Sequence, residues 1–415
     1  MKRWIGSLVV APWALLAATL AGAEERKPLD QLLVEKGVLT KEEAASVQGA
    51  KLAAWLDRIT FGGDIRLRQE MVYRHNGADD RSRQRFRLRV GADLKIDTVV
   101  VGVRLASGTG EHVSANKSFD DLSAPTPLYI DRAFVRWQGD DTRWLTVTGG
   151  RMGNPFFSVY SSDLVWDDDY NPEGLAENLS FALGGGDVFV NLAQIVLDED
   201  SAGSLSTDQW LFGQQVGVKM NPTTTLQTAL AVTYLNAVNT QNGTLDQSVC
   251  ADGNSRQATG TLCPGSTTRN AELVNDYDVV HVTAAATTKL ASLPVSVMGD
   301  AVKNTADTQD ASGNDTKDGG YQVGVILGKA GDPRTWEVAY FYKKVGTDAT
   351  LADIADSDFG TDGGTDRKGH IMWAAYNPTQ AIQVKSKYMT SEVEDDSSAE
   401  QKDVSRLQIE LSVKF

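Results

Sequence analysis

From about residue 59 onward, apolar and polar residues alternate along the chain. In the last segment, Leu407, Ile409, Leu411, Val413 and Phe415 alternate with Arg406, Gln408, Glu410, Ser412 and Lys414. The same two-residue period recurs at 86–96, 226–234, 321–327 and 336–342. In a β-strand, successive side chains point to opposite faces, so a period of two places all apolar residues on one face and all polar residues on the other. The pattern therefore predicts an all-β chain whose strands have one apolar and one polar face.

The connections between these strands alternate strictly in length. Short turns are expected near 97–98, 139–141, 184–186, 221–223, 291–293, 330–333 and 377–380. Long polar loops are expected near 74–82, 109–127, 153–173, 198–207, 237–277, 304–318, 345–366 and 391–402. This order is typical of outer-membrane barrels, which have short periplasmic turns and long external loops. We therefore expect a transmembrane antiparallel β-barrel of about sixteen strands, with both termini in the periplasm.

The N-terminal region does not follow the barrel pattern. Lys2 and Arg3 precede an apolar stretch, and Ala21-Gly22-Ala23 forms a small-x-small cleavage pattern, so residues 1–23 read as a signal peptide. Residues 24–58 show helical spacing and predict a periplasmic helical hairpin or coil. The barrel is expected to occupy residues 59–415.

Composition narrows the functional classes. The chain has 415 residues and a formal net charge of -15, which argues against a nucleic-acid partner because such proteins need a basic face. Mean hydropathy is -0.27, which is mild for a membrane protein. In a barrel, only alternate residues face lipid, so mild hydropathy agrees with the strand pattern.

Arginines gather on the polar faces of the first four predicted strands. This arginine ladder consists of Arg66, Arg68, Arg85, Arg87, Arg89, Arg104, Arg132 and Arg136. An arginine that faces lipid at mid-depth costs about 2–4 kcal/mol, so these side chains are expected to face the lumen. Two interpretations remain open: a ladder of structural ion pairs, or an electrostatic filter for anionic solutes.

One predicted loop, at 153–173, differs from the others in being both aromatic and acidic. Together with Arg151 before it, it carries the candidate constriction residues Asp163, Asp167, Asp168 and Asp169. Folded into the barrel, it would bring carboxylates against the arginine ladder and narrow the pore. Alternatively it is a solvated surface loop, or its aspartate run binds Ca²⁺ through carboxylate oxygens.

Cysteine and histidine usage gives little sign of catalysis or cofactors. Cys250 and Cys263 lie in the longest loop and are expected to form a disulfide in an oxidising compartment. The four histidines are scattered, and no phosphate-binding or metalloprotease motif is present. No Cys-x-x-Cys-His motif attaches haem. We therefore expect no enzyme activity, no metal site and no cofactor.

The segment from Gly150 through Gly174 resembles the putative porin family of Gram-negative outer membranes. Its most specific piece is the Asp-Leu-Val-Trp-Asp-Asp-Asp stretch at 163–169, and the segments at 32–44 and 65–68 are similar to that family too. The C-terminal Phe415 is similar to the signal that the barrel assembly machinery reads. The resemblance implies a general or weakly selective diffusion channel in outer-membrane lipids, often a homotrimer.

The sequence thus predicts a porin that passes small hydrophilic solutes by passive diffusion. Three alternatives stay open: an anion-selective or phosphate-selective porin, a barrel that sheathes a multihaem electron conduit, and an outer-membrane hydrolase.

Overall fold

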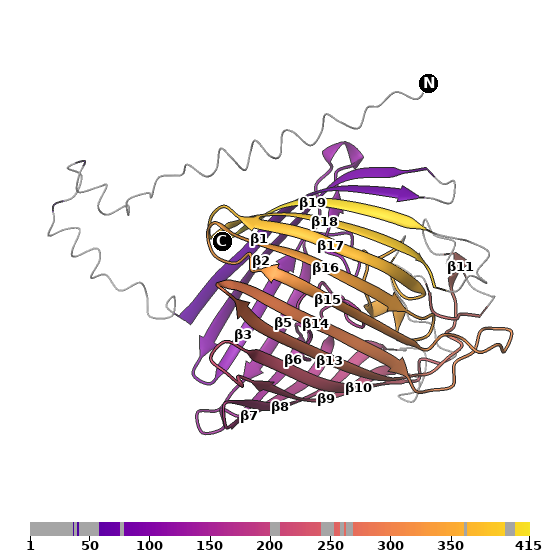
Figure 1. Ribbon diagram of the computed structural model, residues 1–415, viewed down its shortest axis with the longest axis horizontal. Helices are drawn as coiled ribbons and strands as arrows, with labels where there is room; N and C mark the ends of the chain where they lie inside the picture. Colours follow the sequence, from indigo (N-terminus) through magenta and orange to yellow (C-terminus); the bar gives the residue numbers. More distant parts are fainter. Residues whose placement is uncertain are drawn as a thin grey trace.

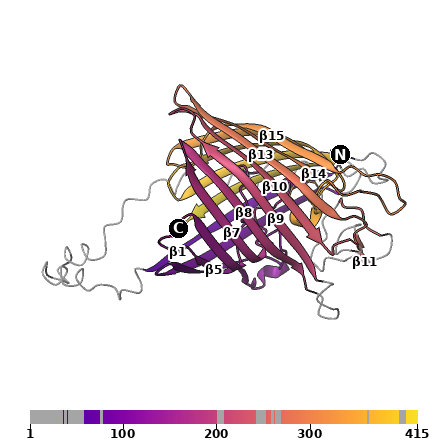
Figure 2. The same cartoon turned by 90° about the horizontal axis from the view of Figure 1, so that it is seen from below.

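The computed structural model is a closed barrel of sixteen antiparallel strands (Figures 1 and 2). It describes residues 36, 40, 58–74, 79–199, 208–241, 253–257, 261–262, 269–360, 363–394 and 403–415. The predicted signal peptide, nearly all of the predicted helical segment at 24–58, and both cysteines lie outside the described residues.

The strands agree closely with the predicted pattern. The barrel strands are β1 (Ile59–Arg74), β2 (Arg81–Ile96), β3 (Val99–Ala106), β5 (Tyr129–Trp137), β6 (Leu145–Arg151), β7 (Glu173–Leu183), β8 (Gly186–Asp198), β9 (Gln209–Met220), β10 (Gln227–Val238), β13 (Tyr277–Leu290), β14 (Leu293–Asn304), β15 (Gly319–Gly328), β16 (Thr335–Val345), β17 (Arg367–Asn377), β18 (Ile382–Val393) and β19 (Val404–Lys414).

The remaining elements are short and belong to the loops. They are the two-residue strands β4 (Lys117–Ser118), β11 (Thr261–Leu262) and β12 (Arg269–Asn270), and the single 3-10 turns η2 (Asp121–Ser123) and η3 (Ala352–Ile354). No helix among the described residues is long and apolar enough to cross a membrane.

The first and last strands close the barrel. β1 pairs antiparallel with β19 in a register that runs from Asp64 opposite Lys414 to Arg74 opposite Val404. At the rim, Gly63 and Phe415 exchange two backbone hydrogen bonds of 2.9 and 3.1 Å. Closure leaves no unpaired edge, which lipid would not tolerate. The predicted all-β fold and strand number are therefore confirmed.

The two ends of the barrel differ in the length of the connections between their strands. The C-terminus lies at the end with the short turns, and the long loops lie at the opposite end (Figure 1). The turn between β7 and β8 is tight because Gly184 and Gly185 take positive φ values of 20° and 97°, which glycine adopts without strain.

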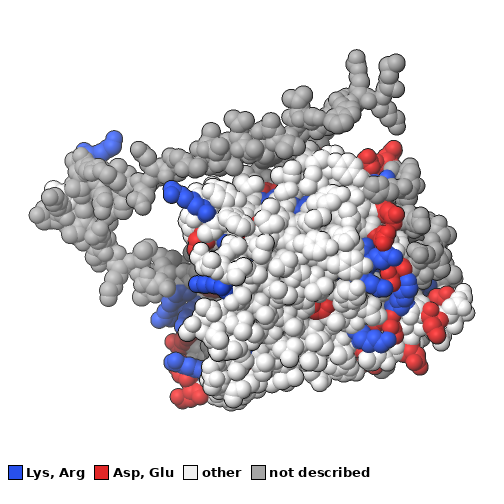
Figure 3. Space-filling model, in the orientation of Figure 1, with Lys and Arg blue, Asp and Glu red and all other residues white. Residues whose placement is uncertain are grey.

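On the face shown in Figure 3, charged side chains gather at the two ends of the barrel and are rare in the band between them. Val232, Val297 and Val338 are among its exposed side chains, at 42%, 54% and 46%. Aromatic side chains lie near the short-turn ends of their strands, as at Trp144 and Phe181, whose stacked rings are 5.7 Å apart. This arrangement is typical of a surface that faces lipid, with aromatic residues at its boundaries.

The inward faces of many strands are covered by the long loops. One hydrophobic cluster joins β7–β10, β13 and β14 to residues of the 152–172 and 346–366 loops. A second joins inward residues of β14–β18, including Phe341 and Trp373, to Val159 and Phe359 of the same loops. The loops therefore fill much of the lumen and bring polar residues to its remaining open part.

Candidate functional site

Six neighbouring strands form a wall of inward cations. Their order around the barrel is β18-β19-β1-β2-β3-β5, so it crosses the closure between the last and first strands. We define the basic wall as Lys385, Lys387, Arg406, Arg66, Arg68, Arg87, Arg89, Arg104 and Arg132. All except Arg406 line a cavity of about 390 Å³ inside the barrel, which we call the lumen cavity.

The arginine ladder is only partly assembled at this cavity. Six of its eight members line the lumen cavity, and the other two do not. Arg85 is buried beside it and donates a 3.4 Å hydrogen bond to the backbone oxygen of Asn116. Arg136 is exposed, and its guanidinium lies 5.0 Å from the centre of the Phe134 ring. The structure thus brings six of the eight predicted arginines to this cavity and places Arg85 and Arg136 outside its lining.

The 152–172 loop places the four predicted aspartates along the cavity. Asp169 Oδ1 accepts hydrogen bonds from Arg87 (3.0 Å) and Arg89 (3.4 Å), and Asp64 on β1 binds the same two arginines. Asp167 instead accepts from backbone N–H groups of Asp169 and Ser357. Of the four aspartates, only Asp169 forms an ion pair with the wall among the described residues.

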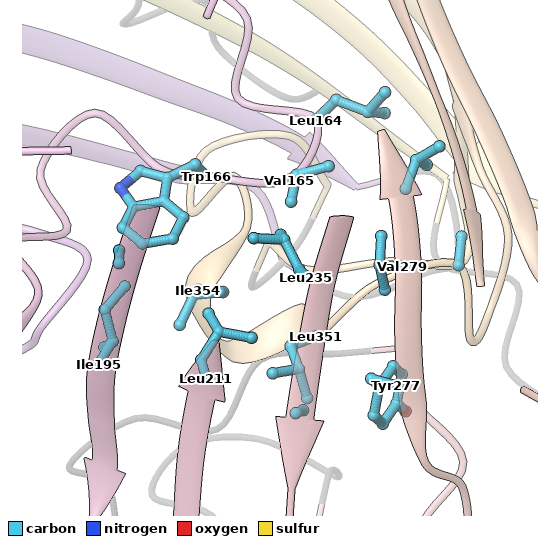
Figure 4. Close-up of a cluster of buried hydrophobic side chains, with 14 of the residues drawn as sticks. Leu164, Val165, Trp166, Ile195, Leu211, Leu235, Tyr277, Val279, Leu351 and Ile354 are labelled. Atoms are coloured by element: carbon cyan, nitrogen blue, oxygen red, sulfur yellow. The ribbon is translucent and has the colours of Figure 1, made fainter. Parts of the chain in front are cut away.

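An apolar triplet anchors this loop to the opposite side of the barrel (Figure 4). Leu164, Val165 and Trp166 are buried against inward residues of β8, β9 and β10, such as Ile195, Leu211 and Leu235. The triplet stands between Asp163 and Asp167, so one short segment packs an apolar side on one wall and directs carboxylates toward the lumen cavity. Burial of the triplet thus holds the acidic residues in place.

A second acidic loop, at 346–366, was not identified as part of the site from sequence. Its Asp356, Ser357 and Asp358 line the same cavity. Asp358 pairs with Arg68 at 3.0 Å and with Arg406 at 3.1 Å. The mixture of apolar and acidic residues at 351–359 repeats the character of the first loop. That composition is the signal that could have revealed it.

The two acidic loops hold each other. The backbone N–H of Asp167 donates to the Ile354 carbonyl at 2.8 Å, and Asp356 N–H donates to the Asp163 carbonyl at 3.2 Å. The buried Lys343 of β16 binds the Asp356 carboxylate at 2.9 Å. These contacts join the two loops to each other and join the 346–366 loop to β16.

The loop between β3 and β5 also contacts the basic wall and the 346–366 loop. Its Asn116 side chain accepts a 2.7 Å hydrogen bond from Arg66, and His112 lies 2.6 Å from the Asp353 carbonyl. The guanidinium of Arg132 donates to the Asn171 side chain at 2.6 Å, and Arg104 contacts Asp131 on β5.

Burial and charge give the loop carboxyl groups different acidities. Burial raises the pKa of Asp163 and Asp167 well above the ordinary range, and neighbouring carboxylates add to the rise. Burial also acts to raise the pKa of Asp169, but the guanidinium groups of Arg87, Arg66 and Arg89 outweigh it and hold that pKa below its usual value. The carboxyl groups of this one loop therefore differ in acidity, and Asp169 is the more acidic.

The other predicted site residues are Arg151 and the two cysteines. Arg151 is the last residue of β6 and pairs with Glu173 of β7 at 2.8 Å, so it belongs to neither the loop nor the lumen cavity. This corrects its assignment to the constriction. The predicted disulfide, Cys250 with Cys263, lies outside the described residues. Within the described part of the chain, no group of three or more His, Cys, Asp or Glu side chains is placed to hold a metal ion.

Comparison with known proteins gives one family and several similar folds. The family described as "Putative porin" matches residues 71–262 and 248–415. OprB of Pseudomonas putida is 12% identical and has a TM-score of 0.56, with 89% of this chain and 97% of that chain covered. A loop L8 deletion mutant of OmpT, an outer membrane protein of Vibrio cholerae, is 11% identical with a TM-score of 0.47, covering 86% and 99%. No curated protein matches the sequence.

Proposed function

The chain belongs to the putative porin family, and on that premise we propose that it forms a water-filled outer-membrane channel for passive diffusion of small hydrophilic solutes. Family and fold point to a channel rather than an enzyme. One observation carries the proposal: cations of the basic wall and carboxyl groups of two inward loops line one cavity inside the barrel. Solutes would pass between these two charged surfaces.

The mechanism combines sieving with a transverse field. The packed loops narrow the lumen, so solute size limits passage. Cations on one side and carboxylates on the other produce a field across the passage, which is strong because the surrounding wall has a low dielectric constant. Charged and dipolar solutes would be oriented as they cross, and large apolar molecules would be excluded.

The same proposal covers the orientation of the channel in the membrane and its contacts there. The apolar outer band would contact membrane lipid, the end with the short turns and both termini would face the periplasm, and Phe415 would serve as the assembly signal. A homotrimer remains a prediction. A multihaem conduit would need a wide, empty lumen, and the hydrophobic clusters inside this barrel do not favour it.

Solute uptake by liposomes tests the proposal. Purified protein in phospholipid vesicles should let arabinose and glucose enter, so that the vesicles swell, while larger oligosaccharides should enter progressively more slowly. The size dependence follows from the narrow passage between the loops and the basic wall. Vesicles that contain folded, heat-modifiable protein yet swell no faster than empty ones would contradict the proposed function.

Anion preference is a second candidate, favoured by the charge balance of the cavity. Its lining contains eight arginine or lysine residues and seven aspartate or glutamate residues. Burial raises the pKa of Asp163 and Asp167 well above the ordinary range, which weakens the negative side of this balance. The remaining excess is positive and would favour anions over cations.

Reversal potentials measured across a KCl gradient test this candidate. The wild-type channel should favour chloride, and Arg87→Glu should shift the preference toward potassium severalfold because it places a carboxylate beside Asp64 and Asp169. Arg136→Glu makes the same charge change away from the cavity and serves as the matched control. If Arg87→Glu and wild type give equal potentials, the basic wall is structural and does not select ions.

A further inference from the structure

Four ionisable side chains around the lumen cavity make no direct ion pair, whereas most of their neighbours do. They are Lys385 and Lys387 on β18, and Asp163 and Asp168 on the 152–172 loop. No ion pair or side-chain hydrogen bond is made by any of these four charged groups among the described residues. We call these four residues the unpaired set.

The surroundings of the unpaired set differ from those of the rest of the basic wall. Most other arginines of the basic wall are paired with carboxylates, as where Arg68 lies 2.7 Å from Glu410 and 3.0 Å from Asp358. Lys385 instead rests its ammonium 4.6 Å from the centre of the Trp373 ring. Asp163 keeps one buried carboxylate oxygen with no hydrogen-bond partner among the described atoms. Buried polar atoms normally have partners. Because Asp163 also lines the cavity, a small rotation of its side chain would offer this oxygen to a ligand.

The opposite charges of this set lie around one cavity and influence one another electrostatically. Lys387 acts electrostatically on both Asp163 and Asp168, and Lys385 also acts on Asp168. They interact electrostatically but form no ion pair, and all four line the same cavity of about 390 Å³. That volume holds about a dozen water molecules, which leaves room for a small organic solute.

A solute that carries both charges complements this arrangement best. A free anion would be attracted by the two lysines and repelled by ionised aspartate, and a free cation would meet the reverse. An uncharged molecule would displace water without replacing its interactions with either side, which costs free energy. A molecule with an ammonium and a carboxylate group on adjacent atoms can satisfy both sides at once.

We propose that the unpaired set forms a binding station for small zwitterions of the amino-acid type, which would cross the channel faster than uncharged molecules of equal size. This inference rests on the proposed channel function. The lysine ammonium groups bind the solute carboxylate through charge-assisted hydrogen bonds, and the aspartates bind its ammonium group. Binding is shared among flexible side chains, so the solute can also leave, as transport requires.

Two isomeric probes isolate the effect of charge from that of size. Alanine is a zwitterion, and lactamide is an uncharged isomer with the same atoms. Liposomes containing the full-length protein should swell in alanine at least about twofold faster than in lactamide, because only alanine gains both electrostatic contacts. In Asp168→Asn combined with Lys387→Met the two rates should become equal.

Matched variants guard against indirect effects. Asp187→Asn combined with Lys289→Met removes the same two charges from exposed positions at the short-turn end and should keep the alanine preference. Asp168→Asn and Lys387→Met are also measured singly, in case the double variant does not fold. Each should lower the ratio of the two rates.

The outcomes separate this inference from the function on which it rests. If neither probe nor arabinose enters, the proposed channel function fails. If both probes enter wild-type vesicles at equal rates, the channel function stands and the zwitterion station is wrong. The station is equally wrong if alanine is preferred but that preference survives in every folded variant of Asp168 and Lys387.

Discussion

Asp169 is the carboxylate through which the 152–172 loop forms ion pairs with the basic wall. Its carboxylate accepts hydrogen bonds from Arg87 and Arg89, which belong to β2. Charge-assisted hydrogen bonds of this kind each contribute about 1.5–3 kcal/mol when partly buried. One carboxylate therefore both fixes the loop and cancels positive charge that would otherwise face the solute.

The acidity of Asp169 predicts how selectivity depends on pH. The arginines hold its pKa below the usual value, so its stabilising effect is present above the ordinary carboxyl pKa of about 3.9 and is lost as pH falls through the lower folded value. Asp169→Asn should therefore increase chloride preference at pH 7. Wild type should approach that preference only below about pH 4.

Reversal potentials recorded from pH 7 to pH 3 check this prediction. The Asp169→Asn channel should change less than wild type over the acid end of that range, because its position 169 no longer titrates. An Asp169→Asn channel with the same selectivity as wild type at pH 7 would show that the carboxylate does not offset the arginine charge.

At the scale of elements, the 152–172 loop is held inward by apolar packing as much as by charge. Trp166 is 7% exposed, and its ring contacts those of Phe156 and Tyr170 at centroid distances of 5.9 and 5.0 Å. Its indole N–H has no hydrogen-bond partner among the described atoms. Its contribution is therefore packing, which a phenylalanine could largely retain.

Trp166→Ala should release the loop and widen the channel. Removing a buried tryptophan side chain costs about 3–5 kcal/mol, which is enough to detach a loop while the strand ladder remains intact. Single-channel conductance and the limiting sugar size should both increase. Trp166→Phe should stay close to wild type, and Trp144→Ala on the outer wall is the control for loss of an exposed tryptophan. A folded Trp166→Ala variant with unchanged conductance would show that this anchor does not set the opening.

Strands and turns could be predicted because their signals are local. A period of two and the alternation of short and long connections are visible within each segment, and they located every barrel strand. Depth along the strand is not visible in that pattern. Arg136 and Arg151 were therefore assigned to the site with the other arginines, although they lie away from the lumen cavity.

Long-range contacts explain what sequence reasoning missed. Arg68 and Glu410 are 342 residues apart, and they meet only because β1 pairs with β19. The same closure brings Lys385 and Lys387 next to the early arginines, which local patterns cannot reveal. The inward path of the 346–366 loop likewise depends on its packing against the first acidic loop.

At the scale of the whole molecule, side chains lie in one of three environments, depending on the direction in which they point. The outer band is apolar, the inward faces of the middle strands are covered by loops, and the strands on either side of the closure line a charged passage. Because alternate residues of the same strands supply the outer and inner surfaces, mild hydropathy and a net charge of -15 are compatible with membrane insertion. Net charge therefore says little about which ions pass.

Single-channel recording of the purified wild-type protein in a planar lipid bilayer tests the central claim most directly. A water-filled passage narrowed by two packed loops should give discrete, reproducible conductance steps, nearly ohmic at low voltage, that scale with salt concentration. Folded protein that inserts into the bilayer but leaves its conductance at the level of bare lipid would contradict an open channel.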